Sequence, residues 1–119
     1  MTTEPKTPAQ LADDAAEAIR ALNHATLSGR PGWEYPADAY SVVGNLGTLV
    51  MRLPQVLEQL TEFVEQLHAD GHVKADGGDT PERIRALSAA SVDTVVTAEK
   101  LRSALDEMHA ALSPLAYQD

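Results

Sequence analysis

His68 and His72 are four residues apart, and no other pair in this sequence comes closer to the spacing of metal-binding histidines. On a continuous helix that spacing would place both imidazoles on one face, where they could bind one metal ion. Gly71 is expected to end the helix between them, and the surrounding sequence supplies no third ligand. We therefore predict that the chain holds no metal at these residues.

The remaining chemistry-bearing residues argue against an enzyme. His24 and His109 stand alone in alanine-rich segments, where an exposed or backbone-bonded imidazole is more common than a catalytic one. The sequence has no cysteine, which excludes a thiolate nucleophile and a thiolate metal site. It also has no glycine-rich phosphate loop and no Gly-x-Ser-x-Gly motif. We expect a non-enzymatic protein with no catalytic residues and no cofactor.

Three aromatic residues could anchor a protein partner. Trp33, Tyr35 and Tyr40 fall within eight residues, although the chain has only one tryptophan, three tyrosines and one phenylalanine. They follow Pro31 and Gly32, in a segment that would otherwise be a polar loop. Two roles are open, because the rings could fold back to plug the end of a helical bundle or protrude as binding anchors.

The strongest pattern in the sequence is an apolar stripe whose members are spaced alternately by three and four residues. It consists of Val43, Leu46, Val50, Leu53, Leu57, Leu60, Val64 and Leu67. This spacing places every member on one helix face, and its seven-residue repeat keeps that face against a partner helix. A second line, Val42, Leu49, Val56 and Phe63, widens the stripe to that of a bundle helix. We predict that the stripe mediates self-association.

Cap signals divide the chain into three helices. Thr7-Pro8-Ala9-Gln10 is expected to start the first, which ends at Ser28-Gly29. The second is expected from Pro36 to about Ala69, and the third from Thr80 to Ser113. Because the two long helices are similar in length and are joined by a glycine-containing linker, they should form an antiparallel hairpin. The first helix can cover only part of this hairpin.

Gly44, Gly47 and Pro54 are unfavourable inside the second helix, and each glycine costs about 1 kcal/mol relative to alanine. The apolar phase continues through them, which favours one long helix with close contacts at the glycines and a bend at Pro54. A hinge, or a separate helix over residues 37–46, are the alternatives. We therefore predict an all-α fold, an elongated antiparallel up-and-down bundle of three or four helices dominated by a long helical hairpin. Residues 7–115 form its single domain, between flexible tails at 1–6 and 116–119.

Small and polar residues occupy the middle of the third helix, at Ser91, Thr94 and Ala98. They would either let another helix approach closely or leave a loosely filled centre. A loose centre would favour a small-ligand-binding or metal-binding helical bundle as an alternative function, with His68 and His72 as further candidates.

Composition restricts the partners. The formal net charge is −9, so a phosphate backbone or an anionic membrane would repel the chain, and we expect no direct contact with nucleic acid. No apolar segment is long enough to span a bilayer, and the first residues lack a basic start followed by an apolar run. We expect a cytoplasmic protein without membrane insertion. An elongated hairpin with a partial lid exposes apolar surface, so we predict a homodimer.

The alanine-rich composition, with more arginine than lysine, resembles that of proteins from high-GC bacteria. A long hairpin of this size is also similar in outline to the Trp-x-Gly helical-hairpin substrates of type VII secretion. Those proteins carry Trp-x-Gly between their long helices, and a tyrosine followed four residues later by an acid near the C-terminus. Here Trp33-Glu34-Tyr35 precedes the hairpin, and Tyr117 is followed only by Gln118 and Asp119. No functional residue carries over, and the resemblance implies only export as a second alternative.

The main functional hypothesis from the sequence is an interaction protein. We expect a self-associating structural or adaptor component that binds a protein partner through its apolar helix faces and through the loop of Trp33 and Tyr35.

Overall fold

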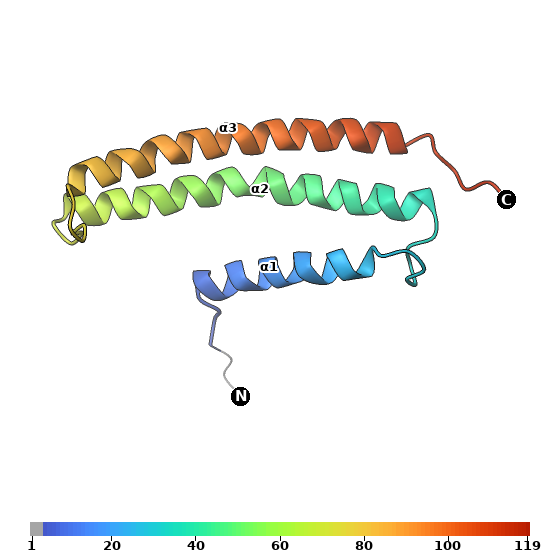
Figure 1. The fold of residues 1–119 in the computed structure, drawn as a ribbon, viewed down its shortest axis with the longest axis horizontal. Helices are drawn as coiled ribbons and strands as arrows, with labels where there is room; N and C mark the ends of the chain where they lie inside the picture. Colours follow the sequence, from blue (N-terminus) through green and yellow to red (C-terminus); the bar gives the residue numbers. More distant parts are fainter. Residues whose placement is uncertain (1–3) are drawn as a thin grey trace.

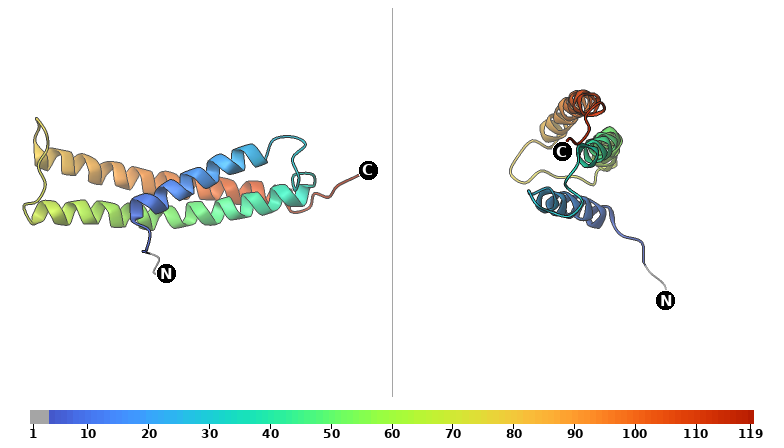
Figure 2. Two further views of the ribbon diagram at one scale, coloured as in Figure 1. Left: turned by 90° about the horizontal axis from the view of Figure 1, so that it is seen from below. Right: turned by 90° about the vertical axis from the view of Figure 1, so that its right-hand side faces the viewer.

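The computed structural model describes residues 4–119 and places them in three helices, α1 (Pro8–Ala25), α2 (Pro36–Ala69) and α3 (Thr80–Leu112). α2 and α3 form a long antiparallel hairpin, and α1 runs along α2 on the side away from α3 (Figures 1 and 2). The molecule extends 65 × 42 × 24 Å. The predicted all-α, elongated bundle is confirmed with three helices, because residues 37–46 belong to α2.

Contacts within the bundle are uneven. α2 and α3 pack along their lengths, whereas no Cα atom of α1 lies within 8 Å of a Cα atom in either. Every side chain of α1 is exposed except Leu22, which is half-buried. The partial lid predicted from the sequence is therefore present as a helix beside the hairpin, but it does not close over it. None of the described helices combines the length and apolarity that crossing a bilayer requires.

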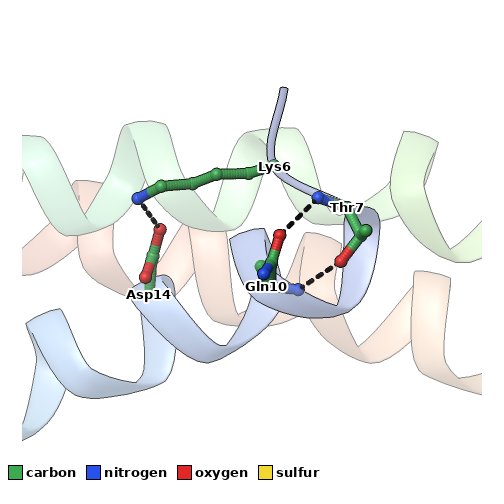
Figure 3. Close-up of polar contacts among 4 residues, drawn as sticks. All are labelled: Lys6, Thr7, Gln10 and Asp14. Atoms are coloured by element: carbon green, nitrogen blue, oxygen red, sulfur yellow. Dashed lines mark hydrogen bonds and ion pairs between the residues drawn. The ribbon is translucent and has the colours of Figure 1, made fainter. Parts of the chain in front are cut away.

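The start of α1 follows the predicted capping box (Figure 3). The Thr7 hydroxyl accepts a hydrogen bond from the Gln10 amide at 3.2 Å, and the Gln10 side chain accepts one from the Thr7 amide at 2.8 Å. The Lys6 ammonium pairs with the carboxylate of Asp14, in the second turn of the helix. Residues 1–3 of the predicted N-terminal tail lie outside the described residues. α1 ends at Ala25, slightly before the predicted stop at Ser28-Gly29.

α3 begins where the sequence predicted, but with a different cap. The carboxylate of Asp79 accepts a hydrogen bond from the Glu82 amide at 3.3 Å, so Asp79 rather than Thr80 is the N-cap. The Thr80 hydroxyl instead accepts a hydrogen bond from the Ala75 amide at 3.0 Å, within the connection between α2 and α3. The two side chains together fix the angle at which the chain enters α3.

α2 continues without interruption through Gly44, Gly47 and Pro54. A Cβ atom at Gly44 would lie 3.1 Å from Nε2 of His109, so the predicted close contact with another helix is confirmed there. At Gly47 the same prediction is wrong, because a Cβ atom would meet nothing within 4 Å. Gly47 lies along an open groove that the side chains of α3 do not fill.

The core between α2 and α3 is thin. Its buried residues are Val43, Val50, Thr61 and Ala98, and no side chain is less than 2% exposed among the described residues. The Thr61 hydroxyl lies 2.8 Å from the Ser91 hydroxyl oxygen, across the two helices. Ser91 and Ala98 therefore lie in the contact between the helices, which was the first of the two roles predicted for them, whereas Thr94 is exposed beside an open groove.

Candidate functional site

α3 packs on one side of the predicted apolar stripe of α2. The line Val43, Val50, Leu57 and Val64, here called the core line, is buried or half-buried. On one side of it Thr61 is only 7% exposed, and Pro54 is half-buried against α3. On the other side Leu53 is 38% exposed and Leu60 is 49% exposed. α3 thus covers the core line and the Pro54–Thr61 side, and leaves the central leucines uncovered.

A groove shows which residues of α3 flank these leucines. It is open, has a volume of about 310 Å³, and is lined by Leu53, Leu57, Thr94, Thr97, Ala98 and Leu101, with Asp93 at its rim. The apolar side chains of both helices therefore meet on the same side of the hairpin. We call this side the apolar face and define it by its exposed large residues. They are Leu49, Leu53, Val56, Leu60, Phe63, Leu101 and Met108.

The apolar face carries no charge along the middle of its central lines, and Arg83 lies on one of them in the first turn of α3. Residues spaced by seven occupy the same line of a packed helix. On α2 the two lines of this face read Leu46, Leu53, Leu60, Leu67 and Leu49, Val56, Phe63. On α3 they read Leu87, Thr94, Leu101, Met108 and Ala90, Thr97, Ala104. A partner seated here would bury apolar side chains and would not have to desolvate an ion.

The opposite face of the hairpin is charged. Its grooves are lined by Met51, Glu99, Arg102, Asp106 and His109. Glu65 belongs to the same side, and its carboxylate accepts a hydrogen bond from the Ser88 hydroxyl at 2.9 Å. The two faces of one hairpin thus differ in chemistry, which makes the apolar face a specific surface and not part of a generally apolar exterior.

The three aromatic residues singled out from the sequence lie at the end of the hairpin opposite its α2–α3 connection (Figure 1). Tyr35 contacts Tyr117 edge to face, with ring centroids 5.4 Å apart, and Tyr40 stacks on His109 at 3.9 Å. Trp33 is half-buried, while Tyr35 and Tyr40 are exposed. The rings therefore pack within the chain and also reach solvent, and the part they play in partner binding stays a prediction.

Two members of this cluster were not identified from the sequence. Tyr117 lies in the segment predicted as a C-terminal tail, and His109 was considered only as an isolated imidazole. A signal was present for His109, because Gly44 on the facing helix leaves space for a ring. No local pattern links Tyr117 to Tyr35, since 82 residues separate them in the sequence.

Asp38 fixes the connection that enters α2. Its carboxylate accepts hydrogen bonds from the backbone amides of Glu34 at 2.9 Å and Tyr35 at 3.0 Å. The hydrogen bond from Glu34 has the larger effect on the pKa of the Asp38 carboxyl, and that from Tyr35 adds to it. Both hold this pKa below its usual value of 3.8, because they stabilise the charged form of the carboxyl.

The residues considered for metal binding do not form a site in the described part of the chain, whereas Thr94 and Ala98, considered for ligand binding, line the open groove beside Leu53. Gly71, at φ 81°, ends α2 between His68 and His72, so the two imidazoles do not share a helix face. Glu65 and His68 form a Glu-x-x-His pair that was not identified from the sequence, but the Glu65 carboxylate accepts a hydrogen bond from the Ser88 hydroxyl. No three His, Asp or Glu side chains of residues 4–119 come together as metal ligands. Ser91 and Ala98 are used in helix packing.

Comparisons with protein-family models, with curated proteins and with solved structures found no match to this chain. Its function must therefore be inferred from the chemistry of its own residues.

Proposed function

We propose that this protein is a non-enzymatic helical interaction protein that assembles as a homodimer through its apolar face. In this role it is a structural or adaptor component, and the aromatic end with Trp33, Tyr35 and Tyr40 is the surface offered to a further protein partner. The observation that carries the proposal is the amount of surface that one copy leaves exposed.

The folded chain exposes 9385 Å². A globular monomer of 12.7 kDa is expected to expose about 6,200 Å² from the size dependence of protein surfaces. The excess arises because α1 stands apart and the hairpin is only two helices thick. The exposed surface includes large apolar side chains such as Phe63, at 64% exposure, and water contact with such side chains is unfavourable.

The size and charge of the apolar face suit a second copy. A helix of 34 residues is about 50 Å long at 1.5 Å per residue, and two packed helices are about 20 Å wide, giving a face of about 1,000 Å². A stable interface needs about 800 Å² on each partner. Two copies of a chain with net charge −9 repel each other, but the central lines of the apolar face keep carboxylates out of the contact.

The experiment compares two variants whose substituted positions are equally exposed but lie on opposite faces of the hairpin. Phe63 lies on the apolar face, whereas Val92 lies seven residues before Glu99 on the charged face, and both are 64% exposed. In a two-fold dimer each substitution occurs twice, so Phe63→Glu should remove at least about 3 kcal/mol of binding and weaken dimerisation more than about 100-fold. Val92→Glu should leave dimerisation unchanged.

Mass from light scattering after size exclusion, over a concentration series, measures both variants. The wild-type chain should have twice its own mass at high concentration. A monomer at every concentration would contradict the proposal, and so would equal effects of the two variants.

A further inference from the structure

α1 is the least explained element of the fold, because it forms a regular helix without packing on the hairpin. Its apolar side chains, Leu11, Ala15, Ala18, Ile19 and Leu22, lie along one face. Leu11 is 56% exposed, and none of the Cα atoms of α1 comes within 8 Å of α2 or α3. Packed helices lie 8–10 Å apart between their axes, so α1 is farther from α2 than direct packing allows.

The connection between α1 and α2 is built with hydrogen bonds and is not a slack linker. Successive turns join the Leu27 amide to the His24 carbonyl, Arg30 to Leu27 and Trp33 to Arg30. Gly29 and Gly32 adopt positive φ values of 82° and 75°, which the turns require. The Asp38 carboxylate then fixes the last residues of the connection. The separation of α1 from the hairpin is therefore specified by local structure.

α1 has 18 residues, and most of the stability of a helix in a protein comes from the packing of its apolar face against a partner. The end-on view in Figure 2 shows α3, α2 and α1 in succession, with α1 beyond α2. Leu49, Val56 and Phe63 lie on α2 roughly 130° around the helix from its contact with α3, by the 100° rotation of each residue. The apolar face therefore extends around α2, away from α3.

We infer that α1 packs against the second copy of this chain, so that each copy in the dimer contacts both the apolar face and α1 of the other. This inference rests on the proposed homodimer. The occupant is a second copy because α1 and the apolar face are both apolar and free of charge along the middle of their lines, and each matches the other as a partner. Asp13 and Glu17 of α1 lie off this apolar line, and Asp14 lies at its edge, where its carboxylate pairs with the Lys6 ammonium.

The first test compares two charge insertions in α1. Ala18→Glu interrupts the apolar line, whereas Ala16→Glu places the same charge about 160° around the helix, on its opposite side. Ala18→Glu should weaken the dimer at least about tenfold per site, or about 100-fold for two symmetric sites, whereas Ala16→Glu should change the Kd by less than about threefold. Sedimentation equilibrium measures both, with circular dichroism to verify equal helix content.

The second test identifies the chain that α1 contacts. The sequence has no cysteine, so a photoreactive benzophenone maleimide on Ala18→Cys reports on that position alone. Irradiation should give a covalent dimer, several times more than from the same label on Ala16→Cys. Crosslinks confined to a single chain would show that α1 closes on its own hairpin, and would overturn the inference.

The outcomes also separate the two proposals. If Phe63→Glu abolishes the dimer while Ala18→Glu has no more effect than Ala16→Glu, the homodimer stands and the role of α1 is wrong. If the wild-type chain is monomeric at every concentration, both are wrong.

Discussion

Alanine substitutions at the two glycines of α2 should have different effects on stability, although both are helical positions in the same element. Each replacement gains about 1 kcal/mol of helix propensity. At Gly47 the new methyl group meets nothing within 4 Å, so Gly47→Ala should raise the free energy of unfolding by that full amount. For 119 residues this corresponds to an increase in Tm of about 4 °C.

At Gly44 the methyl group would lie 3.1 Å from Nε2 of His109, closer than an ordinary contact. The ring must move by a few tenths of an ångström, yet it is stacked on Tyr40 with centroids 3.9 Å apart. A stacked aromatic contact is worth about 0.5–1.5 kcal/mol, so its disturbance should offset the gain in propensity. Gly44→Ala should therefore leave the Tm close to that of the wild type.

Thermal unfolding followed by circular dichroism measures both variants, at one fixed concentration because association raises the Tm. In a His109→Ala background the obstacle at Gly44 is absent, and Gly44→Ala should then stabilise as much as Gly47→Ala does. Equal stabilisation by the two substitutions in the wild-type background would refute the proposed contact between Gly44 and His109.

Two further predictions concern hydrogen bonds. The folded-state pKa of Asp38 is lowered, so its carboxylate contributes stability that is fully present above the usual value of 3.8 and is lost as the pH falls through the folded-state pKa. Asp38→Asn should thus have a lower Tm than the wild type at pH 7. The difference in Tm should shrink below about pH 4 and vanish when the pH is below the folded-state pKa of Asp38. A difference in Tm that does not depend on pH would contradict this. Thr61→Val should cost about 1 kcal/mol by leaving Ser91 without its partner across the helices. Thr61→Val combined with Ser91→Ala should recover part of that loss in urea unfolding, and a double variant as unstable as the sum of the single variants would argue against the pair.

The helix boundaries were predictable because their signals are local. Thr7 and Gln10 cap α1 within four residues, and Gly71 ends α2 through its own positive φ. Neither depends on another part of the chain. The antiparallel hairpin followed from the similar lengths of α2 and α3 and their short connection.

The face of α2 that α3 covers was not predictable from the same pattern. Hydrophobicity alone favours burial of Leu53 and Leu60, yet α3 packs on the side of Pro54 and Thr61. Hydrogen bonds account for part of the difference, since Thr61 meets Ser91 and Glu65 meets Ser88 across the two helices. Such pairs join residues 30 and 23 positions apart, and the polar side chains involved gave no apolar signal in the sequence.

This choice of face has a consequence for assembly. If α3 covered the leucines, the hairpin would bury its most apolar residues within one chain and would have less need of a partner. Instead, the contact within the chain combines the core line with small and polar residues, such as Thr61, Ser91 and Ala98, and leaves Leu53 and Leu60 exposed. The specific polar pairs set the register of α3 on α2, because a shifted register would separate hydroxyl and carboxylate partners. The exposed leucines are then the residues that the proposed homodimer would bury, because apolar contact is non-directional and depends on area. The thin core of one copy is thus accounted for by the proposed association, which would remove further apolar surface from water.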